Sequence, residues 1–264
     1  MTETTPLSDW QPDQYLRFRD ERTQPTIDLV RRIDVASPAR VMDVGCGPGN
    51  STAVLEATWP KAEIIGLDSS ESMIEKARKT SDKITWVLHD ASRDMASHGS
   101  FDVIFSNAAF QWIPGTRELI PRLYGMLNPG GALAVQAPYV RELPVYAEVL
   151  KLTLRPEWSG HFVEPVTYPL HHPYGFYYDV LCVLGGRVVM WQTEYIHIME
   201  SHQAIVEWYK GSGLRPFLNK LPDETLRQRF TGEYFRAIEQ AYPTERDGKV
   251  LLPFNRVFFL IYKS

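Results

Sequence analysis

Short apolar runs alternate with amphipathic stretches along the first half of the chain. The apolar runs have the length and β-branched content of buried strands, and they lie at Arg40–Val44, Glu63–Asp68, Thr85–His89, Phe101–Asn107 and Gly131–Gln136. Stretches with helical spacing separate them, at Ser51–Thr58, Ser70–Thr80 and Thr116–Leu127. Strands that alternate with helices are typical of βαβ units, so this half of the chain predicts a parallel sheet.

Polar residues, glycine and proline mark where these elements begin and end. Asn50 precedes one helical stretch and Ser69 or Ser70 precedes the next, and both residue types are favoured at helix N-caps. Asn128-Pro129-Gly130-Gly131 follows the third helical stretch. Because proline and glycine interrupt regular structure, this tetrapeptide predicts a helix stop and a turn before the fifth strand.

The second half of the chain has a different texture. Residues 137–186 are rich in Pro, Tyr and Trp, and residues 202–242 have helical spacing interrupted by glycine and proline. Arg187–His197 alternates like a strand, and Val257–Tyr262 is an apolar run that predicts a last strand. The predicted fold class is α/β: a Rossmann-like, doubly wound, mostly parallel seven-stranded sheet with helices on both faces. A helical cap is expected from N-terminal and C-terminal insertions.

These patterns suggest one domain, 1–264, built from several segments. The expected parts are an N-terminal helical lid (1–34), a ligand-binding core (35–137), cap insertions (138–186 and 198–250) and final strands (187–197 and 254–263).

The loop after the first strand gives the most specific indication of a ligand-binding site. It reads Asp43-Val44-Gly45-Cys46-Gly47-Pro48-Gly49 between a strand and a helix. Gly45 and Gly47 allow backbone angles closed to other residues and let a ligand approach the main chain. A dinucleotide loop is also rich in glycine. However, Asp43 would repel a pyrophosphate, whereas it suits an ammonium group, and Pro48 removes a backbone donor.

Acidic and polar residues follow at the ends of the next strands. Asp68 is placed to accept hydrogen bonds from two ribose hydroxyls, and Asp90 could hold an adenine amino group. Asn107 and Ala108 end the fourth strand. Each acidic residue alone could be a helix cap or a surface charge. Together at the carboxyl ends of strands, where open α/β sheets bind ligands, they predict a nucleotide-type site.

Composition limits the partners. The 264 residues carry a formal charge of −4, which argues against a nucleic-acid binder. The two cysteines, Cys46 and Cys182, form no metal-binding spacing, so no metal site is expected and a reduced, cytoplasmic setting is the simplest interpretation. The first residues lack the apolar run of a signal peptide, and no stretch is long enough to span a membrane.

The motifs together resemble class I S-adenosylmethionine-dependent methyltransferases. The resemblance rests on the 43–49 loop, Asp68, Asp90-Ala91 and Leu127–Gly131. It implies that S-adenosylmethionine is the cofactor and S-adenosylhomocysteine the product. Taken with the strand-end reasoning, it assigns to cofactor binding Trp10, Tyr15, Asp43, Gly45, Cys46, Gly47, Asn50, Asp68, Ser69, Met73, Asp90, Ala91, Asn107, Ala108 and Trp112.

Further segments resemble, within that class, the family of methyltransferases that act on trans-aconitate. They include Asp9–Leu16, Ser106–Trp112, Gly213–Pro216 and Arg256. This resemblance implies a cytoplasmic, metal-free enzyme that forms a monomethyl ester; we also expect a monomer. The chain departs from that family's pattern at Tyr139-Val140-Arg141, at the expected mouth of the site. Another small or carrier-bound carboxylic acid is the alternative substrate.

A carboxylate substrate decides which catalytic residues to expect. It is ionised near neutral pH, so no general base is needed and no catalytic residue is expected beyond positioning groups. Arginine suits a carboxylate because its planar fork donates two hydrogen bonds. The candidate positioning residues are Arg22, Tyr195, His197, Arg215 and Arg256. A nicotinamide-dependent dehydrogenase and a binding protein without turnover are the other classes to test.

Overall fold

The computed structural model describes residues 19–167 and 169–264, and they form two compact units. The first, here the sheet unit, comprises described residues of 9–139, 171–193 and 256–264. The second, here the helical unit, comprises described residues of 140–170 and 194–255. The sequence-based cap boundary at residue 186 differs from this division. Residues 171–193 group with the sheet because Tyr177, Val180 and Leu181 are part of the core packed against it.

A seven-stranded sheet organises the first unit, in the order β3-β2-β1-β4-β5-β7-β6. Strands β1 to β5 pair in parallel, and β7 pairs antiparallel with β5. The strands are β1 Arg40–Val44, β2 Glu63–Asp68, β3 Thr85–Leu88, β4 Phe101–Asn107, β5 Leu127–Pro138, β6 Arg187–Met199 and β7 Val250–Tyr262. The predicted doubly wound, mostly parallel sheet is therefore confirmed.

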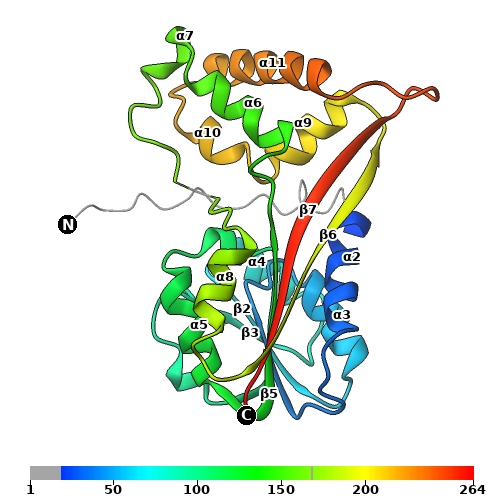
Figure 1. The fold of residues 1–264 in the computed structure, drawn as a ribbon, viewed down its shortest axis with the longest axis vertical. Coiled ribbons are helices and arrows are strands. Elements are labelled where there is room, and N and C mark those ends of the chain that lie inside the picture. Colours follow the sequence, from blue (N-terminus) through cyan, green and yellow to red (C-terminus); the bar gives the residue numbers. More distant parts are fainter. Residues whose placement is uncertain (1–18, 168) are drawn as a thin grey trace. The chain divides into compact units, whose positions relative to one another are not determined.

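Helices cover both faces of this sheet (Figure 1). On one side lie α2 and α3, and on the other lie α5 and α8. The main apolar core joins the α5 and α8 side to the sheet through residues such as Leu123, Leu181, Val135 and Phe259. Burial of these large side chains is the chief stabilising contribution to this layer. The helices of the unit are α2 Arg19–Val30, α3 Asn50–Thr58, α4 Glu71–Ala77, α5 Thr116–Gly125 and α8 Tyr174–Leu181, with short 3-10 turns η1 Ala96–His98 and η2 Phe110–Trp112.

The helical unit is built around its longest helix, α11, which packs against α6 and α9. Its helices are α6 Pro144–Thr153, α7 Pro156–Ser159, α9 His202–Lys210, α10 Arg215–Asn219 and α11 Glu224–Ala241. Tyr234 on α11 donates a hydrogen bond to the Val145 carbonyl (2.7 Å), and the Trp158 indole donates to Glu233 (2.8 Å). Both long strands, β6 and β7, contribute residues to each unit.

The structure corrects the turn expected at Asn128–Gly131. These residues belong to β5, whose pairing with β4 shifts register across a bulge. Gly130 has a φ of 77°, its N–H donates to the Lys263 carbonyl (2.8 Å), and Lys263 N–H donates to the Gly131 carbonyl (2.9 Å). Since Lys263, the residue after β7, satisfies these backbone groups, turn-forming residues occur inside a strand.

The two predicted N-caps have different outcomes. Ser70 caps α4, because its hydroxyl accepts a hydrogen bond from Met73 N–H (3.4 Å). Asn50 is not the cap of α3 but its first residue, and Gly49 with a φ of 97° takes the cap position. Left-handed backbone at this point favours glycine over asparagine.

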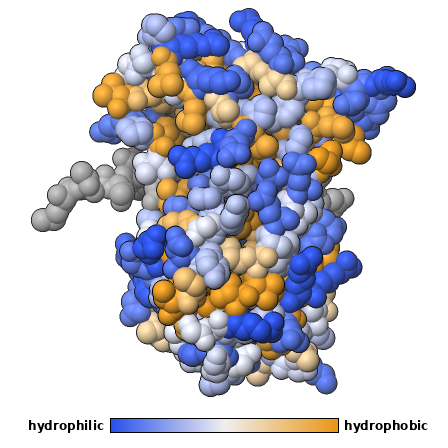
Figure 2. Space-filling view, in the orientation of Figure 1, coloured by the Kyte–Doolittle hydropathy of each residue, from blue (hydrophilic) through white to orange (hydrophobic). Residues whose placement is uncertain are grey.

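Among the described residues, none of the helices has both the length and the apolar character needed to cross a membrane. Hydrophobic and hydrophilic side chains are mixed over the face drawn in Figure 2.

Candidate active site

The glycine loop joins β1 to α3 and is held against the end of β2. The N–H groups of Gly45 and Cys46 donate to the Leu67 carbonyl at 2.7 and 3.0 Å, and Gly47 N–H donates to Asp68 Oδ2 at 2.9 Å. The Cys46 side chain is buried, and burial together with Asp43 and Asp68 raises the pKa of its thiol well above the ordinary value. The thiol is therefore protonated and structural, while the loop backbone is fixed in place.

The two predicted loop glycines differ in what surrounds them. Both have positive φ, 75° for Gly45 and 55° for Gly47. A Cβ at Gly45 would overlap that of Ala109, whereas a Cβ at Gly47 would meet no described atom within 4 Å. The loop is thus tightly packed at Gly45 and open over Gly47, which fits the approach of a ligand to the main chain.

Asp43 lies at the carboxyl end of β1 and is fully buried. Its Oδ2 accepts hydrogen bonds from the Ser51 and Thr52 hydroxyls at 2.7 Å each, which ties the strand to the first turn of α3. Burial raises the pKa of Asp43 to about 6, although these two hydrogen bonds lower it. Among the residues described, Asp43 Oδ1 has no hydrogen-bond partner, and the same holds for Asn50 Nδ2 at the start of α3.

Asp68 ends β2 and joins two backbone segments. Its Oδ2 accepts from Gly47 N–H and its Oδ1 from Ser70 N–H, both at 2.9 Å. Ser69 between them is exposed. The Asp68 carboxylate is therefore held at the edge of the sheet by backbone N–H groups from the glycine loop and from the start of α4.

Beyond β3, the predicted adenine end is a capped turn. Asp90 Oδ1 accepts from Ser92 N–H at 2.9 Å, and Asp90 Oδ2 lies 3.9 Å from Arg93 Nε. Ala91 is buried, and its carbonyl accepts from Arg122 at 3.2 Å. On α4, Met73 is also buried. Asp90 therefore has the turn-stabilising role that an Asx residue takes in loops, whichever ligand it contacts.

The end of β4 is strained. Ala108 is the only non-glycine residue with a positive φ, 53°, in the described part of the chain. Its N–H donates to the Gln136 carbonyl (2.9 Å), and its carbonyl accepts from Gln111 Nε2 (2.7 Å). Such a conformation costs on the order of 1–2 kcal/mol, and retained strain is typical of ligand sites. Trp112, in η2, is partly buried.

Two side chains on β5 and β7 form a buried polar contact. The guanidinium of Arg256, only 3% exposed, donates from Nη1 to Gln136 Oε1 at 3.3 Å. Gln136 is fully buried, and its Nε2 has no hydrogen-bond partner among the residues that the structure describes. Sequence reasoning selected Arg256 and missed Gln136. The available signal was a carboxamide within an otherwise apolar strand.

Strand register places these groups beside Asn107. Asn107 pairs with Gln136, and Gln136 pairs with Phe258, so all three side chains share a face of the sheet. Arg256 lies two residues before Phe258 and is on the same face. Asn107 Oδ1 is buried and, like Gln136 Nε2, lacks a partner within the described ranges.

The same face continues onto β1 and β2. Asp43 pairs with Phe105, two residues before Asn107, and with Gly66, two residues before Asp68. By the alternation of side chains along strands, both carboxylates lie on this face. We call the set Asp68, Asp43, Asn107, Gln136 and Arg256, ordered across β2, β1, β4, β5 and β7, the polar row.

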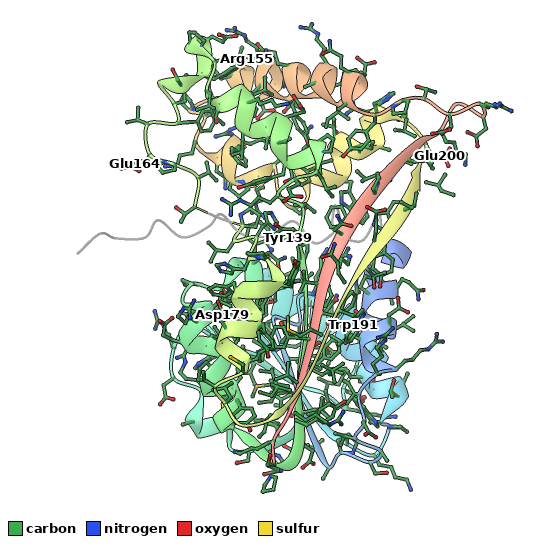
Figure 3. All side chains as sticks on the ribbon, in the orientation of Figure 1. Tyr139, Arg155, Glu164, Asp179, Trp191 and Glu200 are labelled. Carbon is green, nitrogen blue, oxygen red and sulfur yellow. The ribbon has the colours of Figure 1, made fainter. Side chains whose placement is uncertain are left out.

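An aromatic stack lies beside Gln136, because Phe258 is the residue on β7 that pairs with Gln136. The Trp191 indole on β6, labelled in Figure 3, stacks on Phe258 with ring centroids 4.8 Å apart and planes within 7°. The Arg32 guanidinium lies 4.4 Å from the centre of the Trp191 ring system. Stacked aromatic rings of this kind cover the sheet beside Gln136 with apolar surface.

The helical unit holds three other predicted residues. His197 is buried among aromatic rings, with centroids 5.0 Å from Trp208 and 5.9 Å from Phe254. Tyr195 is partly buried, with its ring nearly parallel to that of His197 at 6.4 Å. Arg215 is the partly buried first residue of α10.

Three predicted contacts are not tested by the side chains described. Trp10 and Tyr15 lie outside the described residues, and Arg22 lies in α2 where only the backbone is described. The segment that departs from the family pattern has a buried middle: Tyr139 packs on the apolar core of the sheet unit, Val140 is 1% exposed, and Arg141 is exposed.

The described side chains contain no group of three or more His, Cys, Asp or Glu that could hold a metal ion. His171 and His172, adjacent in sequence, have separate surroundings. His171 Nδ1 lies 3.2 Å from the Pro138 carbonyl oxygen, and the His172 ring stacks on Phe176 with centroids 3.8 Å apart.

The sheet order, with a glycine loop after β1 and an antiparallel β7 beside β5, defines a Rossmann-like methyltransferase fold. Residues 41–131 match the model of a methyltransferase domain family. A protein from Bacillus halodurans C-125 described as a methyltransferase has the same fold (TM-score 0.59, 13% identity), covering 91% of this chain and 99% of its own. An N-methyltransferase from Haemonchus contortus, solved with phosphomonomethylethanolamine and S-adenosylhomocysteine, covers 91% of this chain and 52% of its own (TM-score 0.55, 18% identity).

Sequence relatives narrow the family. The trans-aconitate 2-methyltransferase of Variovorax paradoxus is 41% identical over 263 residues, which cover 98% of this chain and 100% of the relative. The chain belongs to the trans-aconitate 2-methyltransferase family.

Proposed function

We propose that this protein transfers a methyl group from S-adenosylmethionine to a carboxylate of trans-aconitate, giving the monomethyl ester and S-adenosylhomocysteine. The proposal is supported by a full-length relative with that name and by the polar groups at the carboxyl edge of the sheet. Another small or carrier-bound carboxylic acid is the alternative substrate.

The observation that carries the proposal is the change of polarity along the polar row. Its β2 and β1 members, Asp68 and Asp43, are hydrogen-bond acceptors, whereas on β5 and β7 Gln136 and Arg256 offer donors. S-adenosylmethionine carries a cationic sulfonium and an ammonium, and the acid carries negative charges. Opposite ends of one row therefore suit the two substrates of the reaction.

The chemistry asks little of the side chains beyond binding. A carboxylate oxygen forms the new bond to the methyl carbon while the carbon–sulfur bond breaks, and the electron pair stays on sulfur. No proton moves, so no general base is required. The contribution of the protein is to align the reacting atoms and to exclude water from them. Buried Asp43, Gln136 and Arg256, with the Trp191–Phe258 stack beside Gln136, have the properties that this role requires.

Individual roles follow from position. On the donor-substrate side, we assign the ammonium to Asp43, the ribose to Asp68, the adenine to Asp90 and Ala91, and the sulfonium side to Asn107 and Ala108. The remaining residues selected for cofactor binding from the sequence keep that assignment. Arg256 is assigned to a carboxylate of the acid. Arg22, Tyr195, His197 and Arg215 stay predictions for the same role.

The direct test is transfer of a radiolabelled methyl group to a panel of acids: trans-aconitate, cis-aconitate, citrate and isocitrate. We expect a base-labile ester, formed fastest with trans-aconitate. Labelling of another acid at a higher kcat/KM would correct the substrate. Absence of a labelled ester from every acid would refute carboxyl methylation. Titration with NAD and with S-adenosylhomocysteine tests the alternative hypothesis that the protein is a dehydrogenase, because a dehydrogenase requires tight NAD binding.

We also propose that the protein acts as a cytoplasmic monomer. All five side chains of the polar row come from one chain, and both cysteines are unpaired, with Cys182 exposed. Sedimentation at assay concentration should give the mass of one chain. A dimeric mass, or recovery of the native protein outside the cytoplasm, would contradict this.

A further inference from the structure

Gln136 is a polar side chain in a position that usually holds an apolar one. It is fully buried on β5, between the buried residues Val135 and Ala137. A carboxamide N–H₂ taken out of water without a new acceptor is destabilising by a few kcal/mol. In the described part of the chain its Nε2 has no such acceptor. The fold therefore maintains a donor at this position that it does not itself use.

The orientation of this carboxamide is fixed by its neighbour. Its Oε1 accepts a hydrogen bond from the Arg256 guanidinium at 3.3 Å. If the amide were flipped, its N–H₂ would face the N–H groups of arginine, which has no acceptor. Because the flipped state is excluded, the Nε2 donor must point away from the guanidinium.

The neighbouring strand, β4, provides no described acceptor for this donor. Asn107 pairs with Gln136 and has a buried Oδ1, yet neither atom has a partner among the described side chains and backbone. The Gln136 carbonyl is held by Ala108 N–H at 2.9 Å, which anchors the backbone beneath the side chain. A rigid backbone makes the position of the donor well defined.

Gln136 is also neutral, which matters beside a buried cation. A glutamate at this position would form an ion pair with Arg256, whereas the carboxamide binds the guanidinium through its dipole and adds no negative charge. Carboxamide N–H and guanidinium N–H then present donors from adjacent strands. A carboxylate has two oxygens and can accept hydrogen bonds from two such donors.

Building on the proposed function, we infer that Gln136 binds a carboxylate of the acid substrate through Nε2, beside Arg256, which is assigned to the same acid. Gln136 is then a specificity-determining residue: it favours anionic acids over neutral or cationic methyl acceptors. It acts on the acid side of the polar row and makes no demand on the cofactor side.

Two substitutions separate binding from structure. Gln136→Glu keeps the shape and gains an ion pair with Arg256, so the melting temperature should be unchanged or higher. It should nevertheless weaken acid binding by about 30-fold or more, because a donor is lost and a like charge is added. Gln136→Met removes the polar group at similar volume and should weaken acid binding by about tenfold, the value of one hydrogen bond to a charged group.

The measurement is calorimetric titration of trans-aconitate into protein saturated with S-adenosylhomocysteine, together with titration of S-adenosylhomocysteine itself. Affinity for the latter should stay within about twofold in both variants, because cofactor and acid sites are distinct. Ser106→Ala is the matched control. Ser106 is also fully buried, on β4, but it faces the other side of the sheet and donates to the Val44 carbonyl at 2.8 Å. It should lower the melting temperature without weakening acid binding.

The outcomes distinguish this inference from the proposed function. Wild-type acid affinity in Gln136→Glu would overturn the role of Gln136 while leaving the reaction intact. Weakened acid binding by both variants in a protein that transfers no methyl group would support the role and refute the reaction. If the wild-type protein binds no polycarboxylate, both fail.

Discussion

The carboxylates at the two ends of the parallel strands differ in burial and in how far hydrogen bonds satisfy them. At the amino edge, Asp102 on β4 accepts from the N–H groups of Ala39 (2.7 Å) and Arg40 (3.0 Å) and from Asn128 Nδ2 (2.8 Å). Although burial acts to raise it, these hydrogen bonds hold the pKa of Asp102 below the ordinary value. At the carboxyl edge, burial dominates and raises the pKa of Asp43 to about 6.

The difference separates a structural carboxylate from a carboxylate held ready for a ligand. Asp102 uses both oxygens within the protein, whereas Asp43 Oδ1 has no partner in the described residues. Hydrogen bonds that satisfy an anion stabilise the fold, while an unsatisfied buried anion is destabilising until a cation arrives. Asp102 therefore stabilises the sheet at its amino edge, whereas the buried Asp43 carboxylate destabilises it at the carboxyl edge until a ligand binds.

The largest effect is expected from replacing a glycine by alanine. Gly45 at the carboxyl edge and Gly130 at the amino edge have similar φ, so the two substitutions can be compared. Gly45→Ala at the carboxyl edge would place a Cβ against Ala109, so we expect S-adenosylhomocysteine affinity to fall about 100-fold or more. Gly130→Ala at the amino edge has a φ of 77° but no described atom within 4 Å of the new Cβ. It should cost only about 1 kcal/mol of stability and leave affinity unchanged. Calorimetric titration measures the S-adenosylhomocysteine affinity of both variants, and thermal unfolding measures their stability. Equal losses of affinity in the two variants would show that the positive φ of the glycine, and not the contact with Ala109, determines the affinity.

A smaller effect is expected from Asp102→Ala, which removes three hydrogen bonds at the amino edge. We expect a loss of about 2 kcal/mol in unfolding free energy, or roughly 5 °C in Tm, with KM unchanged. The folded pKa of Asp102 lies below its unfolded value. Its contribution is therefore present above the unfolded pKa and is lost as pH falls through the folded one. The Tm difference from wild type should shrink below about pH 4. Exposed Asp82→Ala is the control, and a difference that persists in acid would count against this account.

The smallest effect concerns the pH dependence of cofactor affinity. With a pKa of about 6, Asp43 loses its charge as pH falls from 7 to 5. If it binds the ammonium group, S-adenosylhomocysteine should bind about tenfold more weakly at pH 5 than at pH 7. Asp43→Asn should bind weakly at both values. A flat wild-type profile would assign Asp43 to the fold through Ser51 and Thr52 alone.

Local signals predicted much of the fold. The bounds of β1, β2 and β4 were predicted to the residue, because each is an apolar run that stops at a glycine, an acid or an amide. The polarity of the cofactor side could be predicted for the same reason, since Asp43 and Asp68 stand next to those boundaries.

What could not be predicted depends on partners distant in sequence. The bulge at Gly130 is stabilised by Lys263, and the Gln136 side chain is oriented by Arg256, 120 residues further along the chain. The pattern of neighbouring residues alone predicts a turn at Gly130 and an ordinary strand residue at Gln136. Both features depend on tertiary hydrogen bonds, and a single sequence does not show which distant residues form them.

The position of β7 has a consequence for synthesis of the protein on the ribosome. It lies between β5 and β6 in the sheet, although it is translated after both. Until β7 emerges, β5 has an open edge and β6 has no neighbour in the sheet. The nascent chain therefore displays the open edge of β5 and the unpaired β6 while the 50 residues between β6 and β7 are translated. Chaperones that shield strand edges are accordingly most useful to it during that interval.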